Sequence, residues 1–141
     1  MTPMYTATAT AHGGRQGHVK SDDGFIDLDL RTPKSMGGPG GATNPEQLFA
    51  AGYAACFQGA MGFVAGQKKL NAADSEVVGH VSIGANDAGP GFKLAVRHEV
   101  TLPHLSQADA EALVAAAHEV CPYSNATRGN IDVSFEVKGG A

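Results

Sequence analysis

An apolar run of 19 residues constrains the fold of this chain more than any other feature. Residues 48–66, LFAAGYAACFQGAMGFVAG, contain one strongly polar side chain, Gln58. The run is long enough to cross a bilayer, but alanine and glycine insert weakly, and the rest of the chain alternates polar and apolar residues as a water-exposed sheet does. We therefore expect a central buried helix and no membrane-spanning segment.

Signals at both ends of the run indicate where this helix begins and ends. Thr43 or Asn44 can cap its N-terminus, and Pro45 suits the first helical position. Lys68 and Lys69 place positive charge at the negative end of the helix dipole. The helix is therefore expected to begin at Pro45 and to end near these lysines.

Small residues recur along one side of the expected helix. They are Gly52, Ala55, Gly59, Gly62 and Gly66. A glycine inside a helix costs about 1 kcal/mol relative to alanine. Because four glycines share this side, we expect another backbone to pack unusually close to it.

The remaining segments predict strands and a second helix. Strands are expected over residues 4–12, 17–20, 25–31, 76–85, 92–102 and 130–137, with a glycine- and proline-rich loop at 32–43. Ser106, with Asp109 three residues later, resembles a capping box that opens a helix ending at Cys121. This order indicates an α+β fold with mostly antiparallel sheet, in a single domain over residues 1–141.

Charge and composition argue against several classes of function. The net charge is −4 without any lysine or arginine cluster, so we expect no nucleic acid partner and no anionic membrane surface. The six histidines form no pair with metal-ligand spacing, so no metal is expected. The N-terminal segment lacks the pattern of a secretory signal, and two cysteines without such a signal point to a cytoplasmic protein.

The two cysteines lie in different surroundings. Cys56 is in the middle of the apolar run, and Cys121 follows an amphipathic helical pattern and precedes Pro122. A free cysteine is most often a small buried hydrophobe, and burial favours the neutral thiol. A reactive Cys56 needs a nearby cation to stabilise its thiolate. The local sequence alone does not choose among the arginines, which are Arg15, Arg31, Arg97 and Arg128.

Three long segments contain distinctive motifs. They are YTATATAHGGR at 5–15, GGATNPEQLFAAGYAACF at 40–57 and AHEVCPYSNATRGNIDV at 117–133. In these segments, and nearly end to end, the chain resembles the Ohr/OsmC family of thiol-dependent peroxidases, specifically its organic hydroperoxide resistance (Ohr) branch. The resemblance implies an OsmC/Ohr-like fold, with mostly antiparallel sheets around a central helix, in an intertwined homodimer.

The resemblance also implies roles for four residues. Cys56 in AACF matches the peroxidatic cysteine, and Cys121 in VCPY matches the resolving cysteine. Arg15 in GGR matches the arginine that stabilises the thiolate and orients the peroxide, and Glu46 in NPEQ matches the glutamate that holds this arginine. From the residues alone, Glu46 could instead only stabilise the helix, because its negative charge lies at the positive end of the helix dipole.

The chemistry implied by the resemblance needs no cofactor. An organic or fatty-acid hydroperoxide oxidises Cys56 to a sulfenic acid, which condenses with Cys121 to a disulfide. A dithiol then reduces the pair, and the resemblance implies lipoyl groups on carrier proteins as this partner. Two alternatives are an OsmC-branch protein with related chemistry, and a peroxide-sensing or hydrophobic-ligand-binding protein.

Apolar residues follow the face of Cys56 along the helix. Phe49, Tyr53 and Phe63, with Ala60, lie at offsets of three, four or seven residues from Cys56. Such a wall favours bulky organic hydroperoxides over hydrated hydrogen peroxide, although the same residues also suit an ordinary core.

Helix geometry constrains how these residues combine. Glu46 and Cys56 are ten residues apart, which is about 15 Å along a straight helix. Either the helix is interrupted near Gly52, or Arg15 and Glu46 serve the Cys56 of a partner subunit. We expect the second arrangement, a composite site in a homodimer.

Overall fold

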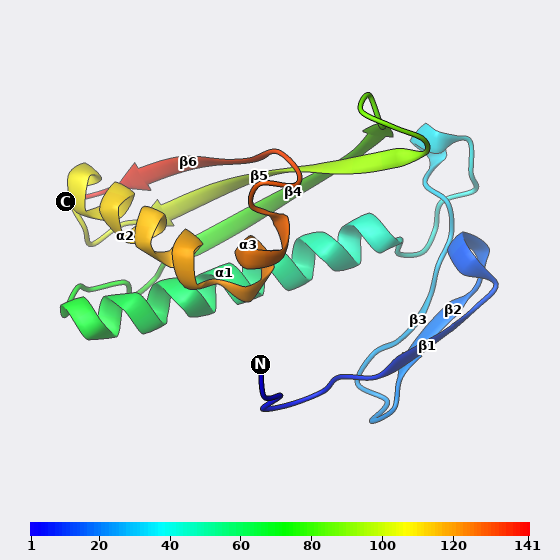
Figure 1. Ribbon diagram of the computed structural model, residues 1–141, viewed down its shortest axis with the longest axis horizontal. Helices are drawn as coiled ribbons and strands as arrows, with labels where there is room; N and C mark the ends of the chain where they lie inside the picture. Colours follow the sequence, from blue (N-terminus) through cyan, green and yellow to red (C-terminus); the bar gives the residue numbers. More distant parts are fainter. The chain divides into compact units, whose positions relative to one another are not determined.

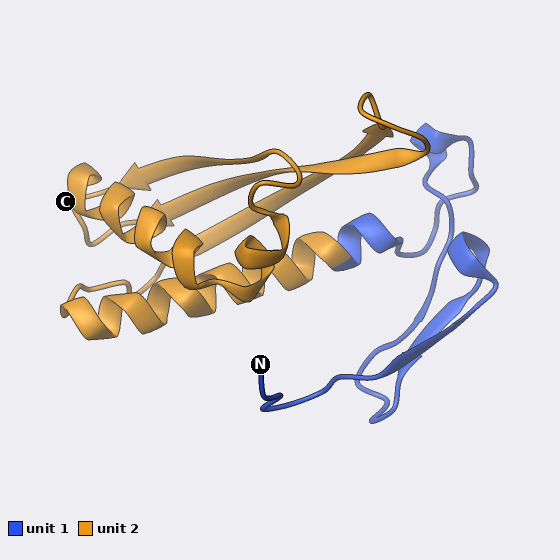
Figure 2. Cartoon of the chain, in the orientation of Figure 1, with its two compact units in different colours: residues 1–48 blue, residues 49–141 orange.

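The computed structural model describes residues 1–141, which form two compact units, residues 1–48 and residues 49–141 (Figure 2). Each unit contains its own three-stranded sheet. The two sheets and the long helix make an α+β fold, as expected. That residues 1–141 act as one domain stays a prediction.

The sheet of the N-terminal unit is a small antiparallel meander. Its strands are β1 (Ala9–His12), β2 (His18–Ser21) and β3 (Asp27–Asp29), in the order β1-β2-β3. β1 and β3 are shorter than the predicted strands at 4–12 and 25–31. At one end, pairing stops because β2 enters the turn at residues 22–24 after Ser21, whose partner is Ala9. At the other end, Leu30 forms an isolated bridge with Thr43.

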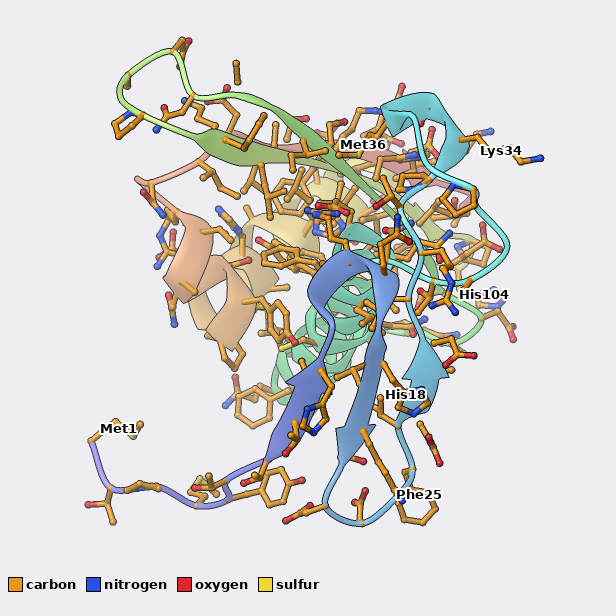
Figure 3. The ribbon with its side chains drawn as sticks, turned by 90° about the vertical axis from the view of Figure 1, so that its right-hand side faces the viewer. Met1, His18, Phe25, Lys34, Met36 and His104 are labelled. Carbon is orange, nitrogen blue, oxygen red and sulfur yellow. The ribbon has the colours of Figure 1, made fainter.

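Most of the large apolar side chains in the segment 25–31 are uncovered within this chain. Phe25, Ile26 and Leu28 are exposed, whereas Leu30 is buried. Phe25 projects from the turn between β2 and β3, far from the start of the chain at Met1 (Figure 3). The unit therefore exposes more apolar surface than a small sheet usually leaves to water.

The long helix α1 spans Pro45–Lys68 without interruption. The Oδ1 of Asn44 accepts a hydrogen bond from the backbone N–H of Gln47 at 2.9 Å, which confirms the expected cap. Lys69, with φ of 56°, ends the helix. An interruption near Gly52, one of the two alternatives above, is therefore wrong.

The sheet of the C-terminal unit has the order β4-β5-β6. β4 (Glu76–Ala85) and β5 (Phe92–Leu102) form an antiparallel hairpin with the predicted bounds, and β6 (Val133–Gly139) pairs parallel to β5. The helices α1 and α2 (Gln107–Val120) lie along one face of this sheet (Figure 1). The core of the unit lies between that face and the helices, and it includes Phe57, Val100 and Leu113.

Two features of the helices differ from expectation. A short helix, α3 (Pro122–Thr127), follows Cys121, where the sequence predicted a stop at Pro122. Proline lacks an N–H that the first turn of a helix does not need, so the same residue starts a new helix. On α1, a Cβ built at Gly59, Gly62 or Gly66 meets no atom within 4 Å. The close backbone expected there is not provided by this chain.

Candidate active site

The two cysteines lie next to each other in the C-terminal unit. The Sγ atoms of Cys56 and Cys121 are 3.6 Å apart, although the residues are 65 positions apart in the sequence. Both are free thiols, Cys121 fully buried and Cys56 half-buried. Cys56 lies in the middle of α1, and Cys121 joins α2 to α3. A small movement of either side chain would therefore allow a disulfide to form.

The surroundings of Cys56 in this unit oppose ionisation of its thiol. Burial raises the pKa of Cys56, the backbone N–H of Tyr123 lowers it, and the neighbouring Cys121 raises it again, with a net increase. A thiol with a raised pKa is a poor nucleophile at neutral pH. Reaction with a peroxide therefore requires a cation that these neighbours do not supply.

The N-terminal unit contains an arginine that is held by a carboxylate. Arg15 donates two hydrogen bonds to Glu46, from Nη1 to Oε2 at 2.9 Å and from Nη2 to Oε1 at 2.5 Å. This bidentate pair lowers the pKa of Glu46, chiefly through the hydrogen bonds from Arg15. Glu46 fixes the guanidinium and leaves its remaining N–H groups free to donate to a ligand.

The loop before β2 sets the position of Arg15. Arg15 lies in a single 3-10 turn, Gly14–Gln16, which begins after Gly13 in the left-handed region with φ of 77°. A Cβ built at Gly17 would lie 1.7 Å from the carbonyl oxygen of His12. Only glycine fits at this position, so the GGRQG segment forms a fixed turn that presents Arg15.

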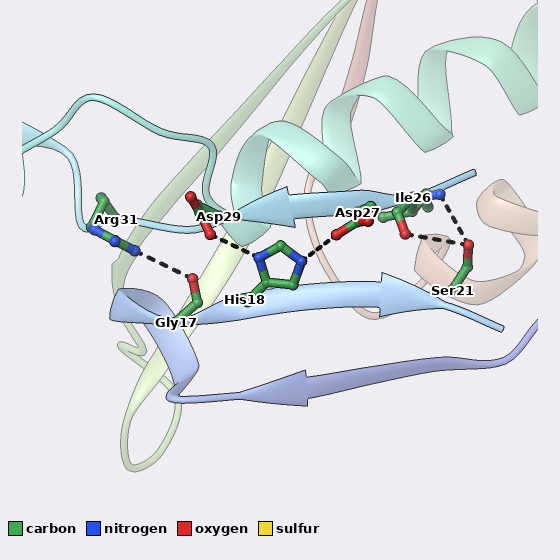
Figure 4. Close-up of polar contacts among 7 residues, drawn as sticks. All are labelled: Gly17, His18, Ser21, Ile26, Asp27, Asp29 and Arg31. Atoms are coloured by element: carbon green, nitrogen blue, oxygen red, sulfur yellow. Dashed lines mark hydrogen bonds and ion pairs between the residues drawn. The ribbon is translucent and has the colours of Figure 1, made fainter. Parts of the chain in front are cut away.

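A charged cluster adjoins this turn on β2 and β3. The ring of His18 lies between two carboxylates, with Nδ1 at 2.7 Å from Asp29 and Nε2 at 2.5 Å from Asp27 (Figure 4). These hydrogen bonds raise the pKa of His18, with Asp29 as the largest cause. Because carboxylates only accept, both contacts are made when the imidazole is protonated. The cluster fixes the β2–β3 pairing beside the Arg15 turn.

The predicted apolar wall is divided between core and surface. Tyr53 is fully buried, and its ring packs against Phe49 and Tyr123. Phe49 also contacts Tyr123 edge-on, with ring centroids 6.0 Å apart. Phe63 is 61% exposed in this chain. A role for Phe49, Tyr53 and Phe63 in binding substrate stays a prediction.

Phe49 also borders an open groove of about 490 Å³. The other lining residues come from the β4–β5 hairpin, from the end of α3 and from the segment after it: Asn86, Ala88, Phe92, Lys93, Leu94, Ala126, Thr127, Asn130 and Ile131.

Groups of His, Cys, Asp and Glu arranged to hold a metal ion are absent from the structure.

Sequence reasoning missed the polar residues that surround Cys121. Ser124 and Thr127 of α3 are buried and bind the hydroxyl of Tyr53, at 2.8 and 3.1 Å. His118 binds Ser124 at 2.8 Å. In the sequence, the segment HEVCPYSNAT indicates only Cys121 as a candidate site residue. The sequence held no clear signal for their contact, because the extended backbone of Cys121 separates His118 on α2 from Ser124 on α3, so helical spacing does not relate the two residues.

A family model described as OsmC-like protein matches residues 38–136, well over half of the chain. The chain belongs to the OsmC family. The match covers Glu46, Cys56 and Cys121.

Similar proteins place the chain with the Ohr branch of the OsmC family. It is 50% identical over 135 residues to the organic hydroperoxide resistance protein OhrB of Bacillus subtilis, covering 96% of this chain and 98% of that protein. It is 53% identical over 133 residues to the organic hydroperoxide resistance protein of Xanthomonas axonopodis pv. citri, covering 94% and 93%. A crystal structure of an organic hydroperoxide resistance protein from Legionella pneumophila matches with a TM-score of 0.92 and 54% identity, covering 97% and 99%. The predicted OsmC/Ohr resemblance and the fold of the chain are confirmed, and the intertwined homodimer stays a prediction.

Proposed function

We propose that this protein acts in organic hydroperoxide resistance as a cysteine-based peroxidase. The observation that supports this function most directly is the 3.6 Å separation of two free thiols in a largely apolar setting. The names of the Ohr relatives support the substrate class. Reduction of organic and fatty-acid hydroperoxides to alcohols would contribute to antioxidant defence.

The reaction begins at Cys56. Its thiolate attacks the terminal oxygen of the hydroperoxide, the O–O bond breaks, and the other oxygen leaves as the alcohol after taking up a proton. Cys56 is then a sulfenic acid. The sulfur of Cys121 attacks the sulfur of Cys56, the S–S bond forms, and the sulfenic oxygen leaves as water with the proton of Cys121. A dithiol, which we propose is a lipoyl group, reduces the disulfide and is itself oxidised.

Arg15 supplies the positive charge that the surroundings of Cys56 do not provide. We propose that it does so across a homodimer, with Arg15 and Glu46 of one subunit serving Cys56 of the other. The uninterrupted α1 supports this arrangement, because ten helical residues from Glu46 to Cys56 span about 15 Å. The open side of α1 from Gly59 to Gly66 and the exposed apolar residues of the N-terminal unit also suit a partner subunit.

The apolar residues near Cys56 favour an organic hydroperoxide over hydrogen peroxide. We propose that Phe49, with Tyr53 behind it, forms one wall of the substrate site, and that Phe63 contributes where the subunits meet. The protein works in the cytoplasm, where dithiol reductants are available.

Turnover assays test the proposed activity. With cumene hydroperoxide and dihydrolipoamide, the wild-type protein should consume peroxide catalytically, and Cys56→Ser should not. Cys121→Ser should reduce about one equivalent of peroxide and then stop, since the intramolecular disulfide cannot form. Turnover that survives in Cys56→Ser would rule out this mechanism.

Mixed dimers test the composite site. Random mixing of Arg15→Ala and Cys56→Ser subunits makes about half of the dimers mixed, and each has one complete site, so about one quarter of wild-type activity per chain should return. Each variant alone should remain inactive. If mixing restores no activity, Arg15 acts within its own chain.

A further inference from the structure

Cys121 occupies the corner between two helices. Its backbone is extended, with φ of −64° and ψ of 124°, between the end of α2 and the start of α3. Its N–H donates to the carbonyl of Ala117 and its carbonyl accepts from the N–H of Asn125, both at 2.9 Å. These bonds fix Cys121 to α2 and α3 but not to α1, which contains Cys56.

Buried hydroxyl groups connect this corner to α1. The hydroxyl of Tyr53 lies 2.8 Å from Ser124 Oγ and 3.1 Å from Thr127 Oγ1. Tyr53 precedes Cys56 by three residues, which places both side chains on adjacent turns of one face. All three hydroxyl groups are buried, where hydrogen bonds are not exchanged freely with water. The corner that contains Cys121 is therefore tied to α1 one turn before Cys56.

His118 closes the corner from the other side of Cys121. Its Nδ1 lies 2.8 Å from Ser124 Oγ, so one hydrogen bond joins the last turn of α2 to α3 across Cys121. Arg128 donates from Nη1 to the backbone carbonyl of His118 at 2.8 Å. Ser124 is the residue common to both connections, because it binds His118 on α2 and Tyr53 on α1.

The hydrogens of the network can be counted. Thr127 donates to the carbonyl of Ser124 at 3.3 Å. Every remaining contact is satisfied when Tyr53 donates to Thr127, Ser124 donates to Tyr53, and Nδ1–H of His118 donates to Ser124. Burial and the nearby Arg128 lower the pKa of His118, so its ring is neutral at neutral pH and the Nδ1–H tautomer completes the network.

We infer that Ser124 is a positioning residue for disulfide formation, holding the Cys121 corner against α1 so that the resolving sulfur stays beside Cys56. This inference rests on the proposed function. In the resolving step the S–S bond forms as the S–O bond of the sulfenic acid breaks, and the attacking sulfur must lie in line with that bond. Misplacement by about 1 Å can cost a hundredfold in rate in such a reaction.

Single-turnover kinetics separate the two chemical steps. Reduced protein is mixed with one equivalent of cumene hydroperoxide; loss of peroxide reports oxidation of Cys56, and acid quench with mass spectrometry reports the disulfide. In Ser124→Ala, we expect oxidation of Cys56 within twofold of wild type and disulfide formation slowed roughly tenfold, the size of one or two lost hydrogen bonds. A longer-lived sulfenic acid should also react more with dimedone.

Three further variants make the test specific. Thr127→Val removes the other contact of Tyr53 without changing the side-chain shape, and should slow disulfide formation severalfold even if Ser124→Ala does not fold. Thr127→Ser keeps the hydroxyl and should restore a near wild-type rate. Val114→Ala lowers stability by a cavity in α2 without removing any hydrogen bond of the network, and should leave the ratio of the two rates unchanged.

Two results would contradict the positioning role of Ser124 alone, and a third would contradict the proposed function as well. Unchanged disulfide formation in both Ser124→Ala and Thr127→Val, or equal slowing in Val114→Ala, would overturn the positioning role and leave the peroxidase proposal intact. If Cys56 of the wild-type protein is not oxidised by the peroxide at all, the proposed function itself fails, and this inference fails with it.

Discussion

At the scale of single residues, the reactivity of Cys56 depends on groups that oppose one another. Burial and Cys121 favour its neutral thiol, and the N–H of Tyr123 favours its thiolate only in part. The guanidinium of Arg15, fixed by Glu46, is the cation that the proposed mechanism requires. Because the thiolate is the nucleophile, a change that weakens the ion pair between Arg15 and Glu46 should lower the rate of peroxide reduction.

Glu46→Gln tests the ion pair with little change in shape. Glutamine has one acceptor oxygen in place of two and no charge, so Arg15 loses its bidentate partner. We expect the rate of Cys56 oxidation to fall roughly ten- to hundredfold, as for other residues that orient a reactive group. The matched control is Glu136→Gln, which removes an exposed carboxylate from Arg97 on the outer face of the sheet; an equal loss there would contradict the role of Glu46.

The burial of His98 predicts how the stability of the protein depends on pH. It is fully buried, and neither ring nitrogen has a hydrogen-bond partner. Burial, with the nearby His118 and His80, lowers the pKa of His98 from 6.5 to about 4. Between these values the unfolded chain binds a proton that the folded protein does not, so stability is complete above pH 6.5 and is lost as the pH falls toward 4.

The size of this effect follows from the shift of the pKa. The difference of about 2.5 between the two pKa values corresponds to a loss on the order of 3 kcal/mol in the free energy of unfolding, at about 1.4 kcal/mol per pH unit. Urea unfolding from pH 7.5 to 4 should show that His98→Leu lacks this part of the pH dependence. Parallel curves for wild type and His98→Leu would contradict the prediction.

At the scale of elements, the sequence predicted long and strongly patterned segments well. β4 and β5 have the predicted bounds, and α1 begins and ends where its cap and lysines indicated. The helix α3 was missed, because Pro122 ends one helix and starts another and local sequence does not distinguish the two. The proximity of Cys56 and Cys121 could not be predicted from local pattern, since it depends on how α1, α2 and α3 pack against one another.

The turn that presents Arg15 should be the least tolerant of substitution in the N-terminal unit. Gly17→Ala would place a methyl group 1.7 Å from the carbonyl oxygen of His12 and 2.7 Å from Cα of Gly13, both backbone atoms that cannot move independently. We expect a loss of stability on the order of 2 kcal/mol or more and a large loss of activity. Thermal unfolding measures the first and peroxide consumption the second.

Gly14→Ala is the matched control for this turn. Its Cβ would meet no atom within 4 Å, and the only cost is the positive φ of 57°, about 1–2 kcal/mol. If Gly14→Ala proved the more damaging of the two substitutions, the close approach at Gly17 would not be what shapes the turn.

At the scale of the whole molecule, the exposed surface suggests that one chain is half of the working unit. The glycine side of α1 is open at Gly59, Gly62 and Gly66, and apolar side chains of the N-terminal unit are uncovered. In a chain that worked alone, Gly59→Ala would raise helix stability by up to about 1 kcal/mol. In the proposed homodimer, the added methyl group would instead meet the partner.

We therefore expect Gly59→Ala to weaken the dimer. Sedimentation velocity over a range of protein concentrations should show dissociation at concentrations where the wild-type protein remains dimeric. A wild-type protein that is monomeric throughout, or a Gly59→Ala variant that is simply more stable at unchanged oligomeric state, would contradict a tight contact on this side of α1.

The central claim is that Cys56 and Cys121 form one redox pair that a hydroperoxide oxidises to a disulfide. Mass spectrometry of the reduced protein after one equivalent of cumene hydroperoxide tests it most directly. The account predicts a chain that has lost two hydrogens, and a single linked pair of peptides containing Cys56 and Cys121. A chain of unchanged mass, or one that gains oxygen on Cys56 and never forms the link to Cys121, would contradict it.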